Sequence, residues 1–392
     1  MIDRQEIWTG GLNEEALGAQ PQRRVGLYDT TLRDGEQTVG VVLLPEQKLE
    51  IARLLDAFGI DRIEAGFPRV SEEDWRAVEM IRDAGLRAEL WGFSRAVPDD
   101  VEAIVTLGLQ ATVIEAPVSE VKLRALGVER SEMLRRIRTA VAHASQRGVR
   151  VAYFAVDGSR ADLGFLERVY KTALDAGAQE LVVVDTIGIA TPEAAAYLVG
   201  RVREWAGADV PVHFHGHNDF GLATAAAIAA ARAGASYIHG TINGMGERAG
   251  NTNLAEVALA LDALYGAETG LKLEMVSDVS RRVRELSGYQ MAPWTPLVGE
   301  NLFRRETGTA VSQFHVPEAI EPYAASVVGA RRGVVLGKRS GRDSIRIKSE
   351  ELGLTVPAEH SRALLERVKE LGMRKRGLVT DDEFRSLVEE LD

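Results

Sequence analysis

Short apolar, β-branched runs alternate with segments of helical periodicity along the first two thirds of the chain. Such runs favour strands, and eight of them occur, at residues 25–29, 62–65, 88–91, 111–114, 150–154, 181–184, 212–215 and 236–239. Apolar positions spaced three and four apart predict amphipathic helices between the strands, at residues 45–58, 73–84, 131–147, 163–176, 192–206 and 222–233. Several of these helices are followed by a glycine, which favours the left-handed conformation at a helix end.

This alternation favours a closed (β/α)₈ or TIM barrel over an open sheet. A doubly wound sheet is the alternative, but it more commonly carries a glycine-rich nucleotide-binding turn after its first strand. Here that turn, residues 30–37, reads Thr-Thr-Leu-Arg-Asp-Gly-Glu-Gln. We therefore predict an α/β fold in which a (β/α)₈ barrel is followed by a small, mainly helical C-terminal subdomain.

The pattern changes beyond about residue 264. Residues 272–287 predict a helix, prolines then interrupt a loop-rich stretch, and residues 359–371 and 380–391 predict charged helices. We expect an N-terminal arm at 1–23, the barrel at 24–265, a linker with a first subdomain at 266–345, and a helical C-terminal subdomain at 346–392.

Composition narrows the class of protein. The chain has 392 residues, of which 45% are hydrophobic and 27% charged, as in ordinary globular proteins. A net charge of −11 argues against a general nucleic-acid binder and against a basic membrane-surface protein. The absence of cysteine excludes disulfides and thiolate metal sites. No signal peptide or membrane-spanning run is evident, so we expect a cytoplasmic protein.

Two histidines at the end of the seventh predicted strand indicate a metal site. His215 and His217 are two residues apart, so they point to the same face of a strand. Asp34 follows the first strand, which lies near the seventh when a barrel closes. One carboxylate and two imidazoles form a catalytic metal set for Zn²⁺, Mn²⁺, Co²⁺ or Mg²⁺. The alternative is that these histidines, with His213, are an ordinary polar strand end.

Other polar residues also follow the strand ends, where the active site of such a barrel lies. Each one alone is as readily a helix cap or a salt bridge, but they share one rim: Arg33, Gln37, Glu64, Arg95, Glu115, Arg160, Thr186 and Asn251.

Three motifs carry a family resemblance. They are Tyr-Asp-Thr-Thr-Leu-Arg-Asp-Gly-Glu-Gln at 28–37, His-Gly-His-Asn-Asp at 215–219 and Asn-Gly-Met-Gly-Glu-Arg-Ala-Gly-Asn at 243–251. The chain resembles the DRE-TIM metallolyases, and within them the Claisen-condensing branch of homocitrate, 2-isopropylmalate and citramalate synthases. It is most similar to short homocitrate synthases of the nitrogen-fixation type. The resemblance implies metal-dependent condensation of acetyl-CoA, as co-substrate, with a 2-oxo acid.

The resemblance also implies roles for the rim residues. Asp34, His215 and His217 would hold the metal, with Asn251 as a further ligand. Arg33 would polarise the keto group of the substrate, and Gln37, Glu64 and Thr186 would contact the substrate. Arg95 and Arg160 would bind the distal carboxylate of 2-oxoglutarate, because guanidinium pairs bidentately with carboxylates. Either arginine would otherwise hold a rim salt bridge.

A segment after the barrel, residues 312–323, is similar to the part of these enzymes that reaches into the partner subunit. His315 would help to deprotonate the acetyl methyl group or polarise the thioester, with Tyr323 nearby, and a homodimer with subdomain exchange is implied. From the residues alone, His315 is more simply a loop histidine.

Two features keep other functions open. Val156 stands where many relatives have a glutamate, so condensation with 2-oxoisovalerate or pyruvate, or loss of activity, are alternatives to homocitrate synthesis. A 3-hydroxyacyl-CoA lyase is a further alternative, although such lyases carry a cysteine-bearing loop and this chain has no cysteine. The short C-terminal part leads us to expect no feedback-regulatory domain.

Overall fold

The computed structural model describes residues 2–18 and 23–391, and these form two compact units. One unit comprises Leu17–Gln290, and the other comprises Ile2–Ala16 together with Met291–Asp392. Within the N-terminal arm expected at 1–23, residues 1 and 19–22 lie outside the described residues.

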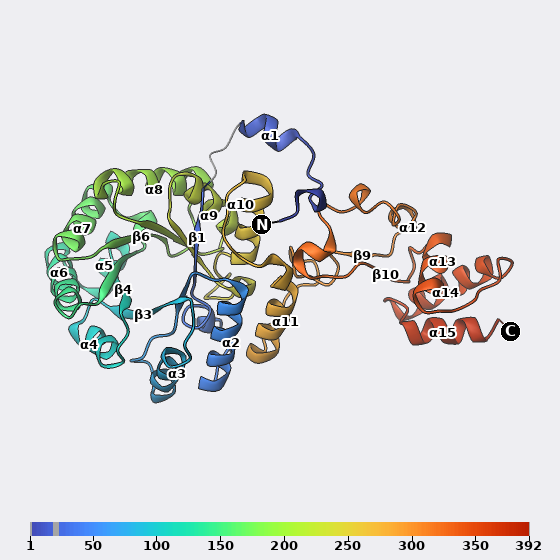
Figure 1. The fold of residues 1–392 in the computed structure, drawn as a ribbon, viewed down its shortest axis with the longest axis horizontal. Helices are drawn as coiled ribbons and strands as arrows, with labels where there is room; N and C mark the ends of the chain where they lie inside the picture. Colours follow the sequence, from blue (N-terminus) through green and yellow to red (C-terminus); the bar gives the residue numbers. More distant parts are fainter. Residues whose placement is uncertain (1, 19–22, 392) are drawn as a thin grey trace. The chain divides into compact units, whose positions relative to one another are not determined.

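The first unit is a closed parallel barrel of eight strands in sequence order, which confirms the predicted fold (Figure 1). All eight predicted strands are present: β1 (Gly26–Asp29), β2 (Arg62–Glu64), β3 (Glu89–Arg95), β4 (Ala111–Pro117), β5 (Arg150–Val156), β6 (Glu180–Asp185), β7 (Val212–Gly216) and β8 (Tyr237–Gly240). β8 pairs with both β7 and β1, with Ile238 in register with Phe214 and with Leu27. The carboxyl ends of β7, β8 and β1 are therefore neighbours on one rim.

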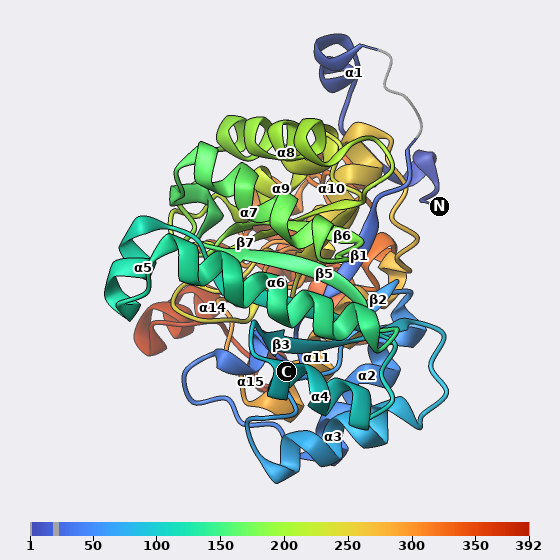
Figure 2. The same cartoon turned by 90° about the vertical axis from the view of Figure 1, so that its left-hand side faces the viewer.

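Helices surround the strands, and α6 runs along the outside of the barrel beside β5 (Figure 2). Their bounds are α2 (Pro45–Phe58), α3 (Glu72–Arg82), α4 (Pro98–Thr106), α5 (Glu120–Leu126), α6 (Arg130–Gln146), α7 (Leu163–Asp175), α8 (Pro192–Ala206), α9 (Ala223–Arg232), α10 (Leu254–Tyr265) and α11 (Val276–Ser287). Short 3₁₀ helices follow several strands: η2 (Gly35–Gln37), η3 (Gly158–Arg160), η4 (Ile242–Gly244) and, before α11, η5 (Leu273–Met275). The six predicted helices are confirmed, whereas α4, α5 and α10 were not predicted. Among the described residues, no helix is both long and apolar enough to span a bilayer.

Alternating residues of the strands point into the barrel and fill it. The middle of this interior is apolar and includes Trp91, Val113, Phe154 and Val182. Its lower end, at the amino ends of the strands, is charged, because Arg62 donates two hydrogen bonds to Glu180 at 2.5 and 3.1 Å. The upper end, at the carboxyl ends of the strands, contains the candidate site.

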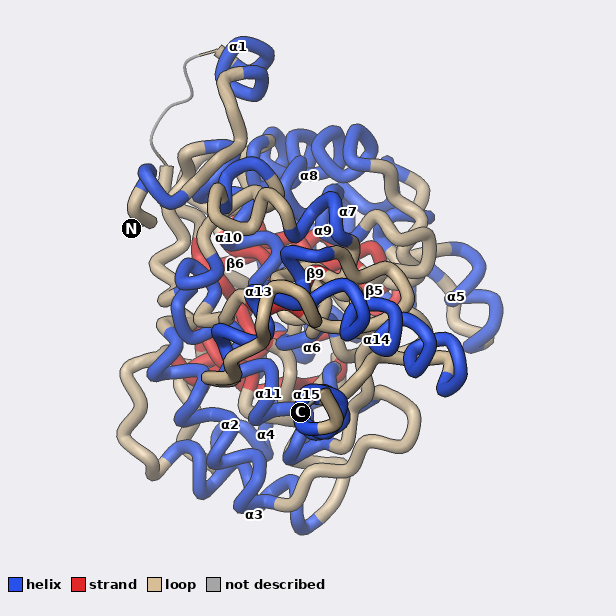
Figure 3. Tube along the Cα trace, turned by 90° about the vertical axis from the view of Figure 1, so that its right-hand side faces the viewer, coloured by secondary structure: helices blue, strands red, loops and turns tan. Residues whose placement is uncertain are grey.

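The second unit is small and has its own core. Its elements are η1 (Arg4–Glu6), α1 (Leu12–Leu17, apart from its last residue), β9 (Arg304–Arg305), α12 (Gly308–Val311), η6 (Pro317–Ala319), η7 (Ala325–Val328), β10 (Gly333–Val334), α13 (Arg342–Glu351), α14 (Ser361–Lys375) and α15 (Asp381–Glu389). The helices α13, α14 and α15 lie together (Figures 1 and 3). Ile345, Leu364 and Phe384 are among the residues that form their common core.

The division differs from the expected boundaries at three places. The barrel unit extends to Gln290 rather than residue 265, because α11 packs against α2. The expected boundary between 345 and 346 falls inside α13, whose Ile345 belongs to the core of the helical subdomain. Residues 2–16 group with the second unit rather than forming a separate arm, because Ile7 pairs with Tyr323.

Candidate metal centre and active-site pocket

The loop after β1 is fixed by buried hydrogen bonds. Asp29 accepts hydrogen bonds from the backbone N–H of Thr31 at 2.8 Å and from its hydroxyl at 2.9 Å. The same hydroxyl accepts from the backbone N–H of Ile242, 2.9 Å away, in the loop after β8. Asp34 follows at the start of η2 and is buried. The β1 and β8 loops thus hold each other, and they position Asp34 at the rim.

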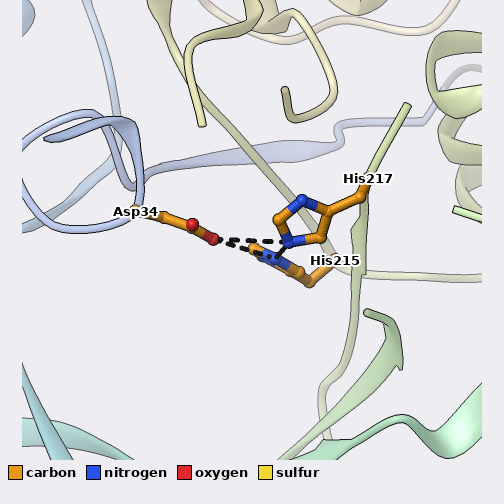
Figure 4. Close-up of side chains that lie close together, drawn as sticks. All are labelled: Asp34, His215 and His217. Atoms are coloured by element: carbon orange, nitrogen blue, oxygen red, sulfur yellow. Dashed lines mark hydrogen bonds and ion pairs between the residues drawn. The ribbon is translucent and has the colours of Figure 1, made fainter. Parts of the chain in front are cut away.

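Asp34, His215 and His217 converge on one point (Figure 4). Oδ2 of Asp34 lies 3.2 Å from Nε2 of His215 and 3.7 Å from Nε2 of His217. The two Nε2 atoms are 3.3 Å apart. All three side chains are buried. The two imidazoles leave the same face of the β7 strand end, as their spacing predicted.

These distances fit a shared divalent cation. Bonds of about 2.0–2.2 Å to a single ion place neighbouring ligand atoms roughly 3.0–3.6 Å apart, close to the three separations observed. Among the described residues, the Nε2 atoms meet only each other and Asp34 in polar contacts. One carboxylate oxygen and two imidazole nitrogens suit Zn²⁺, Mn²⁺, Co²⁺ or Mg²⁺.

Electrostatics keep Asp34 and His217 in their ligating forms. Burial alone would raise the pKa of Asp34, but the Arg33 guanidinium and the two imidazoles lower that pKa below its ordinary value. Burial lowers the pKa of His217 to about 4, against the opposing pull of Asp34. At neutral pH the carboxylate is therefore charged and the His217 imidazole is neutral, as metal ligands are.

Asn251 carries a further oxygen that suits this centre. It forms an isolated bridge with His217, and its Nδ2 donates a hydrogen bond to the backbone oxygen of Met245 at 3.1 Å. Its buried Oδ1 accepts no hydrogen bond from any described residue. Gly246 lies against this amide, and a Cβ there would come 2.2 Å from Nδ2. The glycine therefore makes room for Asn251, whose free oxygen fits a fourth ligand.

Arg33 lies beside the candidate metal centre and is held there by the buried Glu64. Its Nε donates a hydrogen bond to Glu64, and its Nη1 is 3.4 Å from Oδ2 of Asp34. The guanidinium lies over the ring of Phe93, 4.3 Å from the centroid. Its Nη2 is buried and has no hydrogen-bond acceptor among the described residues. Glu64 therefore positions Arg33, and one donor remains available to a substrate oxygen.

A pocket of about 730 Å³ opens over the centre and is lined by Arg33 and the three candidate ligands. Gln37 and Thr186, predicted to contact the substrate, also line it. Glu64 does not, because it is buried beneath Arg33. Val156 lines the wall with other apolar side chains. The Thr186 hydroxyl accepts a hydrogen bond from the backbone N–H of Asp157 at 2.7 Å and is not a helix cap.

The two arginines proposed for a distal carboxylate differ. Arg95 lines the pocket, and the buried Asp100 holds it through hydrogen bonds to Nε and Nη2, at 2.7 and 3.1 Å. Arg160 is not among the lining residues, and it binds Asp157 through Nε and Nη2 instead. For Arg160, the alternative of a rim salt bridge describes the observed contact.

His315 and Tyr323 belong to the second unit. His315 is exposed after α12. Tyr323 is buried, pairs with Ile7 and packs edge-on against Phe303 at 5.8 Å between ring centroids. Tyr323 therefore has a structural role in its own unit.

Four charged pocket residues were not assigned roles from the sequence, namely Glu115, Lys122, Arg136 and Glu247. Glu115, on β4, was noted only as a rim residue, although strand alternation places it on the inward face with Ala111 and Val113. Lys122 lies on α5, a helix that was not predicted, so no signal placed it near the rim.

Comparison with known proteins identifies two family regions. Residues 24–283 match the family described as HMGL-like, and residues 297–376 match the one described as homocitrate synthase post-HMGL domain-like. Solved structures support the fold alone. The HMG-CoA lyase of Brucella melitensis superposes with a TM-score of 0.61 at 20% identity, covering 68% of this chain and 100% of the lyase.

Relatives that match along most of this chain are synthases. Homocitrate synthase AksA of Methanopyrus kandleri is 44% identical over 92% of this chain and 91% of the relative. A probable 2-isopropylmalate synthase of the same organism is 44% identical over 89% of this chain and 70% of the relative. The (R)-citramalate synthase CimA of Methanocaldococcus jannaschii is 38% identical over 94% of this chain and 74% of the relative. These matches confirm the resemblance seen in the motifs. The chain therefore belongs to the HMGL-like family, in the Claisen-condensing branch of the DRE-TIM metallolyases.

Proposed function

We propose that this chain catalyses a metal-dependent condensation of acetyl-CoA with a 2-oxo acid, after which water hydrolyses the thioester of the product and CoA leaves as the free thiol. The observation that carries this proposal is the convergence of Asp34, His215 and His217 on one point at the floor of the pocket. The names of the relatives, which are homocitrate, 2-isopropylmalate and citramalate synthases, support the same reaction class.

Each pocket residue would have a separate role in the reaction. A divalent cation held by the three ligands would polarise the keto carbonyl of the 2-oxo acid. Arg33, held by Glu64, would donate from Nη2 to the oxygen that gains negative charge as the new carbon–carbon bond forms. Gln37 and Thr186, which line the same pocket, would bind the carboxylate next to the keto group.

For the 2-oxo acid itself we propose 2-oxoglutarate, which would give homocitrate. Arg95 supports this choice, because its guanidinium lines the pocket and the buried Asp100 restricts its position. Arg160 is not proposed to bind substrate, since it does not line the pocket. The apolar side chains of Val156, Leu126 and Met133 favour the second candidate, a substrate with a branched or short hydrocarbon side chain.

Release of free thiol from acetyl-CoA tests the function. The purified protein with added divalent metal is assayed against 2-oxoglutarate, 2-oxoisovalerate and pyruvate. We expect release with at least one acid and the highest kcat/KM with 2-oxoglutarate. Higher kcat/KM with 2-oxoisovalerate would reassign the substrate. No release with any acid, while 3-hydroxyacyl-CoA thioesters are cleaved, would replace the condensing activity by a lyase.

We further propose that the protein is a homodimer in which the second unit completes the partner's active site, with His315 as a base or thioester-polarising group. The exposure of His315 and the family match of residues 297–376 support this arrangement. Tyr323 is proposed only to support that segment.

Subunit complementation tests this arrangement. His315→Ala and Asp34→Ala are each expected to be nearly inactive alone. Co-expressed and purified as mixed dimers, they should regain about half of the wild-type rate, since one of the two active sites per mixed dimer is intact. If the mixture stays inactive although mixed dimers are present, the second unit does not complete the partner's active site and this proposal is wrong. Full activity of His315→Ala alone would remove its catalytic role.

A further inference from the structure

Glu115 is an acidic side chain in the pocket wall to which the proposed reaction assigns no role. Its register partners on the neighbouring strands are Arg95 on β3 and Phe154 on β5. Residues in register on adjacent strands share a face of the sheet, and all three line the pocket with the candidate metal ligands. Glu115 therefore faces a molecule bound at that centre, beside the arginine proposed to bind its far end.

No side chain of the described residues neutralises Glu115 through a hydrogen bond or ion pair. Arg95 is engaged by Asp100, and Arg33 is engaged by Glu64. Lys122 contributes a more distant positive charge from α5. The charged and titratable groups that act on or face Glu115 are Arg33 and Asp34 from the β1 loop, Glu64 from β2, Arg95 from β3, Lys122 from α5, Arg136 from α6 and Tyr153 from β5.

Both protonation states of Glu115 are accessible near neutral pH. Burial raises the pKa of Glu115 to about 7, and the negative charges of Asp34 and Glu64 add to this rise, while Arg33 and Lys122 oppose it. A bound divalent cation would lower this pKa. The protonated form can donate a hydrogen bond into the pocket, and the ionised form cannot.

We propose that Glu115 discriminates between 2-oxo acids that have a distal carboxylate and those that do not. With its proton, Glu115 donates a hydrogen bond to the distal carboxylate, next to Arg95. Without its proton, it repels that carboxylate, and the pocket then favours an uncharged side chain against Val156, Leu126 and Met133. This inference rests on the proposed function and adds a specificity-determining residue to it.

The test is the ratio of kcat/KM for 2-oxoglutarate to kcat/KM for 2-oxoisovalerate, measured across pH. A ratio cancels pH effects on the metal centre and on the thioester, which both substrates share. Because two like charges placed together disfavour binding, the wild-type ratio is expected to fall by about tenfold or more from about pH 6 to about pH 8.5. Glu115→Gln, which is neutral and can donate at every pH, should keep a high ratio throughout.

Glu120→Gln is the matched control, because Glu120 lies on α5 outside the pocket lining and pairs with Arg130. It should reproduce the wild-type pH dependence. A wild-type ratio that does not change with pH, or a Glu115→Gln ratio that still falls, would overturn the role of Glu115 while leaving the condensation intact. Absence of turnover with both acids would overturn this inference, and absence of turnover with pyruvate as well would overturn the proposed function.

Discussion

Replacing Asp34 or His215 by alanine is expected to abolish bound divalent metal and turnover together. Each variant removes one of three ligand atoms that lie 3.2 to 3.7 Å from one another. A cation left with two protein ligands binds far more weakly, and its contribution of several kcal/mol to transition-state stabilisation is lost. We expect turnover to fall by at least about a thousandfold. Metal content is measured by elemental analysis after dialysis, and turnover by thiol release from acetyl-CoA.

His143→Ala is the matched control for these variants. His143 lies on α6, on the outside of the barrel, and its Nε2 is 3.0 Å from a carboxylate oxygen of Glu102. This variant should retain full metal content and turnover. Stoichiometric metal and undiminished turnover in Asp34→Ala would show that the convergence of the three side chains is not a metal site.

Arg62→Ala is expected to lower the free energy of unfolding by about 3–5 kcal/mol. Arg62 and Glu180 are buried at the lower end of the barrel, and Glu180 also lies 2.7 Å from Nε2 of His213. Burial tends to raise the pKa of Glu180, but His213 and Arg62 lower it to about 2, so the carboxylate is ionised. Removing Arg62 takes two hydrogen bonds and a positive charge away from that buried carboxylate, which keeps His213 and, at 3.7 Å, Arg150 as neighbours. The guanidinium also packs 3.8 Å from the ring centroid of Tyr237.

Chemical denaturation monitored by circular dichroism measures this loss. Arg281→Ala serves as the control, because Arg281 forms ion pairs with Asp278 and Glu285 on the surface of α11. Surface pairs of this kind contribute at most about 1 kcal/mol. A loss below about 1 kcal/mol in Arg62→Ala would mean that water or a local rearrangement satisfies Glu180.

The barrel and the convergence of the three candidate metal ligands could be predicted because their signals are local. Each strand is an apolar run, and the two-residue spacing of His215 and His217 places both on one face. Closure of the barrel then brings Asp34 to them, as the pairing of β1 with β8 confirms. The proposed support of Arg33 by Glu64 is not local, since these residues are far apart in sequence and meet only through the barrel.

Other features depended on information that a linear pattern does not carry. Arg95 ends β3, Arg160 lies in η3 after β5, and both have an aspartate nearby. Only the tertiary structure decides that Arg95 lines the pocket whereas Arg160 binds Asp157 away from it. Lys122 reaches the pocket from the short helix α5, whose apolar pattern is too brief to recognise. The unit boundaries differ from the expected ones for the same reason. Tertiary packing places α11 in the barrel unit and residues 2–16 in the second unit.

The pairing of Ile7 with Tyr323 has a consequence for synthesis on the ribosome. The backbone N–H of Trp8 donates to the oxygen of Pro322 at 2.8 Å, and that of Ala324 donates to the oxygen of Glu6 at 2.9 Å. At about 5–20 residues per second, the first residues emerge roughly 15 to 60 s before their partners are translated. Residues 6–8 must wait while the whole barrel emerges, and during that interval they are open to chaperones and proteases.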